Sequence, residues 1–204
     1  MKKLILFLAL ITVSISADAD NATDTAFQNL ADEYISDLTS LSPVNATLIG
    51  DHSADGELDR VDDAARAEVL DLLKQYRAAL DALDFEELSI ANQVDADLLL
   101  HDIESNIWSM EDLREWAWNP LYYVNIAGSS IYGLLARDFA PLDERLKSAT
   151  SRLEQIPRFL EQARDSIETD RVPKIHAETA VAQNPGLGSI IDTMIIPHMD
   201  VLSA

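Results

Sequence analysis

Apolar residues recur three and four positions apart along most of this chain. Residues at that spacing lie on one face of an α-helix, so the pattern predicts amphipathic helices that each bury one side. No segment alternates apolar and polar residues for long enough to predict a β-strand. The pattern therefore predicts an all-α fold, arranged as an antiparallel helical bundle of about five to seven helices.

Five of these helices can be located from the pattern and from its breaks. They are expected at about 27–41, 62–83, 89–110, from 120 through at least 133, and at 141–167. Asp62 can cap the second helix, and Pro43 ends the first, because proline cannot continue a helix. Pro157 lies inside the long fifth helix and is expected to kink it. Between Pro43 and Asp62 we expect an ordered connection without a helix.

The pattern also predicts which side chains are buried. In the third helix the buried side is expected to carry five apolar residues: Val94, Leu98, Ile103, Ile107 and Met110. In the fourth helix, small residues between Gly128 and Gly133 should let another helix pack closely. The Pro-Gly-Leu-Gly run at 185–188 is interpreted as a turn that precedes a new apolar segment. Because that segment, 189–204, has few partners within the sequence, it is expected to pack poorly and leave an exposed apolar patch.

The first 19 residues have the layout of a secretory signal peptide. Lys2 and Lys3 precede an apolar run at 4–13, and Ala17 and Ala19 form an A-x-A cleavage pattern. Ten apolar residues are too few for a spanning helix, which needs about 20. We therefore expect a cleaved signal peptide at 1–19 and a helical domain at 20–204, located in the periplasm or secreted, with no membrane contact after cleavage.

The amino-acid composition limits the kinds of partner that we expect for this chain. The chain has 36 acidic and 15 basic residues, a formal net charge of −21. A surface this acidic repels nucleic acid and anionic lipid, so neither is expected as a partner. The chain contains no cysteine, so we expect neither a disulfide framework nor a lipid-attached cysteine.

Several short motifs, in one order, resemble a known family. They are Pro43, Ala46, Thr47 and Gly50 before an acidic loop, Leu88-Ser89 before Val94 to Leu99, Asn119-Pro120-Leu121, Arg152 to Pro157 with Gln162-Ala163-Arg164, and the segment from His176 to Gln183. Together they resemble the N-terminal portion of the bacterial domain-of-unknown-function 885 family. The resemblance implies a secreted, helical relative of zinc-dependent peptidases of the zincin type.

The chemistry of a zincin is not encoded in this sequence. A zincin needs H-E-x-x-H, in which two histidines four residues apart bind zinc and the glutamate activates water. The four histidines are nowhere four residues apart. We therefore assign no catalytic, cofactor-binding or metal-binding residue, and expect zinc only in a C-terminal part that this sequence lacks. Whether the protein is an enzyme stays open, but this chain alone is not expected to be one.

Two residues are weak candidates for contact with a substrate, His176 and Glu178. The His-x-Glu spacing also occurs in zinc deaminases, which require cysteine ligands that are absent here. The alternative is that both residues belong to a polar helix start. Aromatic residues around Pro120 similarly allow two interpretations, as core anchors or as the lining of a peptide groove.

Two function classes follow from the sequence. In the first, the chain is the non-catalytic N-terminal helical part of an exported zincin-like peptidase, and it forms part of the wall or lid of a cleft for a peptide substrate. In the second, it is a stand-alone periplasmic helical binding or adaptor protein. An H-E-x-x-H motif encoded after Ala204 would favour the first.

Export generates the first testable prediction. Cleavage at the A-x-A pattern should leave Asp18 or Asp20 as the mature N-terminus. N-terminal sequencing of the exported protein measures this directly. Recovery of the chain in a membrane fraction with Met1 still present would contradict the prediction.

Overall fold

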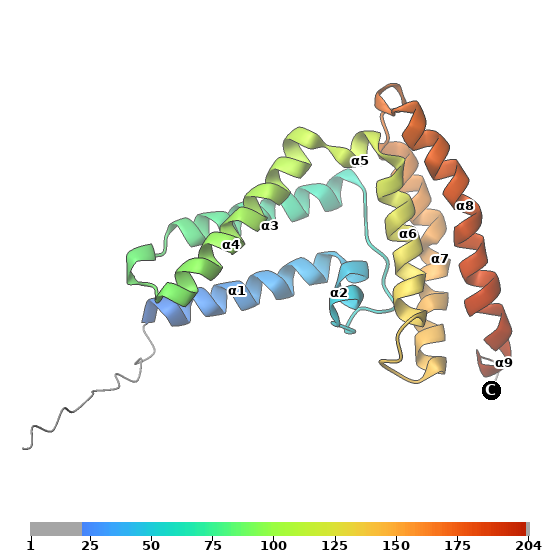
Figure 1. Cartoon of the computed structure of the whole chain (residues 1–204), viewed down its shortest axis with the longest axis horizontal. Coiled ribbons are helices and arrows are strands. Elements are labelled where there is room, and N and C mark those ends of the chain that lie inside the picture. The colour runs from blue at the N-terminus through green and yellow to red at the C-terminus, as the bar shows by residue number, and fades with distance from the viewer. Residues whose placement is uncertain (1–21, 203–204) are drawn as a thin grey trace, which may run out of the picture.

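The computed structural model describes residues 22–202, and within them every regular element is helical (Figure 1). The all-α prediction is confirmed. The main helices are α1 (Ala22–Leu41), α2 (Pro43–Ile49), α3 (Asp63–Asp81), α4 (Ile90–Trp108), α5 (Glu115–Trp118), α6 (Pro120–Leu135), α7 (Leu142–Ser166), α8 (Lys174–Met194) and α9 (Met199–Leu202). The predicted signal peptide lies outside the described residues. No helix within 22–202 is both long and apolar enough to span a membrane.

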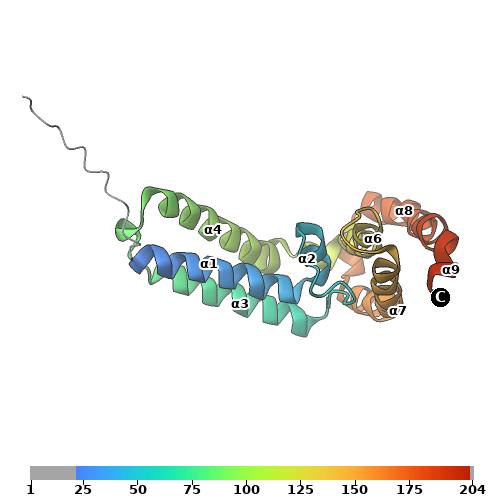
Figure 2. The ribbon, with the colours of Figure 1, turned by 90° about the horizontal axis from the view of Figure 1, so that it is seen from below.

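The long helices form two groups of three. Helices α1, α3 and α4 run side by side, and α6, α7 and α8 form a second group whose axes are turned strongly against the first (Figures 1 and 2). Helix α2 and the segment 50–62 lie between the groups, and α2 packs against α6. On the other side of this junction, the α5 turn connects α4 to α6. The two groups are therefore joined at two places, by α2 with the segment 50–62 and by α5.

The N-terminal group buries Tyr34, Leu73, Tyr76 and Ile103 as its core. The rings of Tyr34 and Tyr76 meet edge to face, with their centroids 5.3 Å apart. Each tyrosine hydroxyl donates to a carboxylate of a neighbouring helix at 2.7 Å, Tyr34 to Asp102 and Tyr76 to Asp37. The aromatic core thus also carries polar bonds that fix the three helices against one another.

In the second group, small residues of α6 allow close packing, as predicted. A Cβ atom on Gly128 would lie 3.1 Å from Leu187 of α8, and one on Gly133 would lie 3.2 Å from Leu48 of α2. Those separations are shorter than ordinary van der Waals contact, so a larger residue at either position would require the facing leucine side chain to shift by a few tenths of an ångström. The core here is formed by residues such as Leu134, from α6, and Leu146, from α7, both fully buried.

The predicted helix starts are confirmed by their caps. The Asp62 carboxylate accepts from the Ala65 amide at 2.8 Å and begins α3. Asn119 caps α6 in the same way, directly before Pro120. The long helix α7 contains Pro157, and the fold includes a bent helix, as that proline predicts.

Two predicted connections are helical instead. Residues expected to form a loop after Pro43 make helix α2, because proline is well suited to the first helical turn, and Gly50 ends that helix at φ +100°. The run at 185–188 was predicted to be a turn, but it lies inside α8. Pro185 removes the amide that would bond to the carbonyl of Val181, a residue that is exposed, so water can take that place.

One prediction of burial was wrong, and another was confirmed only in part. Val94 and Leu98 of α4 are 55% and 63% exposed, because α4 packs on α1 and α3 through a different face that carries Ala96 and Ile103. The apolar residues after Gly188 pack better than expected. Ile195 is buried and Met194 partly buried against the core between α6 and α7, and only residues beyond them, such as Ile196 and Met199, are exposed.

One buried arginine connects α7 to the elements around it. Arg152 is completely buried, and its guanidinium donates to the Ser130 carbonyl of α6 at 2.9 Å. It also donates to the Pro43 carbonyl at 3.0 Å and to the Thr47 hydroxyl at 2.7 Å, both in α2. Burial lowers the pKa of Arg152, which the nearby Asp55 and Asp59 carboxylates oppose. An arginine nonetheless stays charged in a protein, so the guanidinium depends on these acceptors.

The second prediction concerns this arginine. Arg152→Ala should lower the free energy of unfolding by about 3–5 kcal/mol, because it leaves buried acceptors unpaired and opens a cavity. Urea denaturation followed by circular dichroism measures the change. Arg164→Ala in the same helix is the matched control, since that side chain is 77% exposed, and it should change stability by no more than about 0.5 kcal/mol. Equal effects of the two substitutions would contradict the prediction.

Candidate functional site: the cavity between the helix groups

A polar cavity of about 570 Å³ lies where the two helix groups meet. Its lining comes from α1, α2, α3, α4, α5 and α6 and from the segment before α3. The lining side chains include carboxylates, guanidinium groups, amides and two large aromatics, among them Asn45, Asp59, Arg60, Arg66, Asp102, Asn106, Glu115, Trp116 and Tyr122. A volume between 300 and 1,000 Å³ is typical of small-ligand sites, so this cavity is the candidate site.

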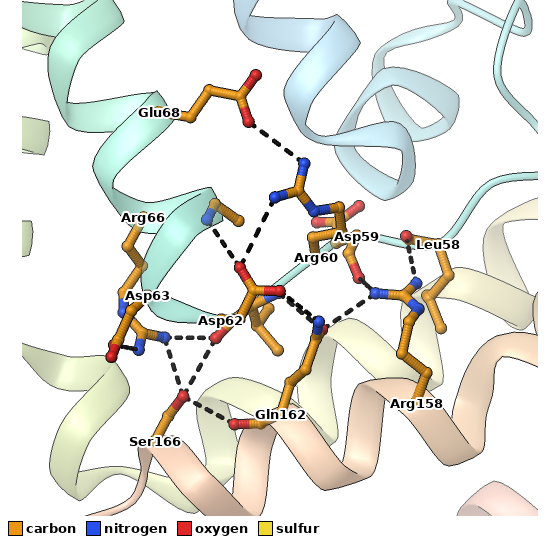
Figure 3. A network of polar contacts seen from close by, with 12 residues as sticks. Leu58, Asp59, Arg60, Asp62, Asp63, Arg66, Glu68, Arg158, Gln162 and Ser166 are labelled. Carbon is orange, nitrogen blue, oxygen red and sulfur yellow. Dashed lines mark hydrogen bonds and ion pairs between the residues drawn. The ribbon is translucent and has the colours of Figure 1, made fainter.

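The segment that forms one wall of the cavity is held by side chains of α7 (Figure 3). Gln162 accepts from the Val61 amide at 3.2 Å and donates to the Asp62 carboxylate at 2.6 Å. Arg158 donates to the carbonyls of Leu58 and Asp59 at 2.8 and 3.2 Å. A backbone segment without helix or strand bonds needs partners for its polar groups, and α7 supplies them.

Gln155 and Ser151 continue this contact further along α7. Both donate to the Gly56 carbonyl at 2.8 Å, and Gln155 also accepts from the Leu58 amide at 3.1 Å. Four polar residues on one side of α7 therefore fix the segment 56–62. The position of the cavity wall follows from the register of that helix.

Arg66 joins the wall to the aromatic turn at α5. Its guanidinium donates to the Val61 carbonyl and to the Ser166 hydroxyl, the latter at 3.0 Å, and it pairs with Asp63. The same guanidinium lies 4.1 Å from the ring centroid of Trp116, and that of Arg114 lies 4.9 Å from it. Two cations near one indole ring hold Trp116 in place at the cavity edge.

Asp59 is the most strongly desolvated carboxylate of the lining. Only 8% of the residue is exposed, and its carboxylate accepts from the Val44 amide at 2.9 Å and the Ser42 hydroxyl at 3.1 Å. Burial raises the pKa of Asp59 above its ordinary value, although both hydrogen bonds and the charge of Arg152 oppose this. Because both oxygens already bond to the start of α2, the principal role of Asp59 is to position that helix.

Tyr122 faces Asp59 from α6 and is 38% exposed. Desolvation of its hydroxyl group raises the pKa of Tyr122 to about 12, with smaller contributions from neighbouring groups that include Tyr123 and Asp59. The hydroxyl therefore stays protonated at neutral pH, as a neutral donor and acceptor in the cavity.

The two sequence-predicted candidates are not brought together at this cavity. The Nδ1 atom of His176 lies 2.9 Å from the side-chain oxygen of Asn119, and its ring is 5.5 Å from that of Trp118. Glu178 is exposed and pairs with Lys174 at 3.5 Å. Neither residue lines the cavity directly, but the Asn119 amide donates to Glu115, which does.

That geometry fixes the hydrogen-bonding state of His176. The Asn119 oxygen accepts from the Leu121 amide, and the Asn119 nitrogen donates to Glu115. The oxygen can therefore only accept from His176, so Nδ1 of His176 carries a proton. His176 and Asn119 thus link the start of α8 to the cavity edge through ordered bonds.

His52 and His101 lie away from His176, in other parts of the fold. The His52 ring stacks on Phe139 with centroids 3.6 Å apart, and its Nδ1 lies 3.0 Å from Asp55. His101 is exposed on α4. Among residues 22–202, no three side chains of histidine, cysteine, aspartate or glutamate come together in a metal-ligand arrangement.

Sequence reasoning missed most of the cavity. Asp59 could not be singled out, because it is one of 36 acidic residues. Trp116 was noticed only as part of the aromatic cluster near Pro120, where it contacts both the core and the cavity. Gln155 and Gln162 were recognised as part of a family motif, but their bonds to a distant segment could not be predicted from spacing.

The third prediction concerns the titration of Asp59. Its folded-state pKa should lie above the ordinary aspartate value of 3.8, whereas that of Asp24, which accepts from the Ser89 amide, should lie below it. A raised carboxyl pKa stabilises the fold at low pH and ceases to do so as the pH rises through that pKa. Carbon-detected NMR of the side-chain carboxyls measures both values, and an Asp59 midpoint at or below that of Asp24 would contradict the prediction.

Comparison with known proteins places the chain in a family. A family model of bacterial proteins of unknown function, DUF885, matches residues 43–194. A solved structure from Shewanella oneidensis, described as "a putative lipoprotein of unknown function", is similar with a TM-score of 0.78 and 32% sequence identity. The similarity covers 84% of this chain but 31% of the Shewanella chain. No curated protein matches the sequence. Since the family model covers most of the sequence, this chain belongs to the DUF885 family.

Proposed function

We propose that this chain is the N-terminal helical portion of an exported, zincin-like peptidase-family protein, and that it forms part of the wall of the substrate cleft without holding the zinc. The observation that carries the proposal is that this chain is much shorter than the similar Shewanella protein. The family model covers residues 43–194, and the chain corresponds to about a third of the Shewanella structure. The H-E-x-x-H motif of zincins is absent from this sequence, so catalysis would depend on the remaining part.

The cavity between the helix groups supports a role in binding a peptide. A peptide presents amide and carbonyl groups that need polar partners, and Asn45, Arg60 and Glu115 offer donors and acceptors in the lining. Trp116 and Tyr122 add apolar surface for side chains of the substrate. The rigid support from α7 would hold these groups in place before the peptide binds, which limits the entropic cost of binding.

Two observations support export. The sequence begins with the layout of a signal peptide, and the similar Shewanella protein is described as a lipoprotein, a class of exported protein. An acidic composition, with 36 aspartate and glutamate residues in the chain, suits a soluble domain in an extracytoplasmic compartment. The periplasm or the exterior of the cell is therefore the proposed location.

The fourth prediction tests this function in two steps. The reading frame should continue after the codon for Ala204 and encode H-E-x-x-H, and the longer protein should hydrolyse peptides only with zinc bound. Sequencing of the transcript and a peptidase assay with and without chelator measure these properties. A stop codon after Ala204, or hydrolysis that a chelator does not affect, would contradict the proposal.

The second step addresses the cavity itself. Asn45→Trp fills part of the cavity from α2, where Asn45 is exposed, and should raise the KM for peptides at least five-fold while kcat changes less than two-fold. Asn125→Trp is the matched control, since Asn125 is exposed on α6 but does not line the cavity. Equal KM values for the two variants would show that substrate does not enter this cavity.

A further inference from the structure

A stripe of exposed apolar residues runs along the whole outer face of α4. Ile90 is 80% exposed, Val94 55%, Leu98 63% and Trp108 54%. His101 and Ser105, both exposed, occupy the same stripe between Leu98 and Trp108. These residues are three or four positions apart, so they lie on one line of the helix, about 27 Å long at 1.5 Å per residue.

This stripe is distinct from the face that forms the core. Helix α4 packs against α1 and α3 through Ala96 and Ile103, which are buried. The helix is therefore apolar on two sides, one covered and one open. Single exposed apolar residues are normal, but Ile90, Val94 and Leu98 form three consecutive steps of the stripe, and Trp108 follows after His101 and Ser105. Such a stripe is typical of a helix that receives another helix.

The charges beside the stripe restrict what can cover it. Helix α4 contains four acidic residues, Asp95, Asp97, Asp102 and Glu104, and no lysine or arginine. Glu104 pairs with Arg77 of α3 at 3.2 Å and Asp102 accepts from Tyr34, so the attraction for a cation rests mainly on Asp95 and Asp97. A second copy of this chain would bring the same acids together from both sides, in a protein with a net charge of −21. An amphipathic helix with lysine or arginine on either side of an apolar stripe would instead be attracted.

We propose that the α4 stripe is the docking surface for a basic amphipathic helix supplied by the part of the longer family protein that lies outside this sequence. The inference rests on the proposed function, because it takes the chain to work as part of a longer protein. The longer family protein has enough additional chain to contain such a helix, since this chain corresponds to 31% of the similar Shewanella chain. The cavity between the helix groups and the α4 stripe would then have separate roles, in substrate binding and in assembly.

The fifth prediction tests the surface with the full chain and a synthetic probe. An 18-residue peptide with leucine at every third or fourth position and lysine beside each leucine should bind and shift the methyl NMR signals of Ile90, Val94 and Leu98. Val94→Asp and Leu98→Asp should each weaken binding at least ten-fold. Val181→Asp is the matched control, because Val181 is a 70% exposed valine on another helix, and it should leave binding unchanged.

A second experiment tests whether binding depends on the positive charge of the peptide. The same peptide with glutamate in place of lysine should bind at least ten-fold more weakly than the lysine peptide. A single thiol gives a second readout, because the chain has no cysteine. Leu98→Cys should react rapidly with a maleimide in the free chain, and the lysine peptide should slow that reaction at least five-fold.

Several results would contradict the proposal that the α4 stripe is a docking surface. These are equal binding of the glutamate and lysine peptides, a loss of binding in Val181→Asp but not in Leu98→Asp, or a dimer of the chain that Leu98→Asp dissociates. An open reading frame after Ala204 without peptide binding would refute the surface and leave the proposed function standing. A stop codon after Ala204 together with peptide binding would refute the proposed function and the source of the helix.

Discussion

The fold depends most on the burial of the Arg152 guanidinium between α2, α6 and α7. A buried cation is costly unless its donors are used, and here they reach two backbone carbonyls and the Thr47 hydroxyl. Thr47 in turn donates to the Asp55 carboxylate at 2.6 Å, and Asp55 also contacts His52. Only the Nε atom of Arg152 is buried without a partner among the described side chains. The charge thus requires α2 to sit in one place, although α2 has only seven residues.

Once α2 is fixed, the rest of the junction follows from polar contacts more than from apolar packing. Asp59 reaches the start of α2, and the segment that carries Asp59 is held by Arg158 and Gln162 of α7. A loop held by side-chain amides and guanidinium groups has a defined conformation without a sheet or helix of its own. This explains why the cavity between the helix groups has rigid walls, although it lies where two helical units meet.

Helices could be located from the sequence because helix caps and apolar periodicity depend on residues that are close together in the chain. Asp62 and Asn119 cap the helices that follow them, and apolar periodicity located five of the six long helices. It did not predict α8, in which 185–188 continues the helix. It failed where an apolar residue had no covering element, as for Val94 and Leu98, since periodicity cannot tell a core face from an open one. It also failed for α2, where proline begins a helix instead of ending one. The cavity could not be predicted, because Asp59, Arg66 and Trp116 come together only through long-range contacts.

The distribution of charge separates the two surfaces that remain open. At the junction, basic side chains of α3 and α7 are paired with groups of the same chain: Arg66 with the Val61 carbonyl and the Asp63 carboxylate, and Arg158 with the Leu58 carbonyl. Along α4 the acids have no lysine or arginine of their own helix as partners, although Glu104 pairs with Arg77 of α3. They flank apolar residues that water covers at a cost. A polar cavity whose cations are paired within the chain is suited to the neutral amide and carbonyl groups of a peptide, whereas an apolar stripe flanked by acids is suited to a basic helix. The acidic composition that disfavours a polyanionic partner would, on the face of α4, favour the cationic helix that we propose.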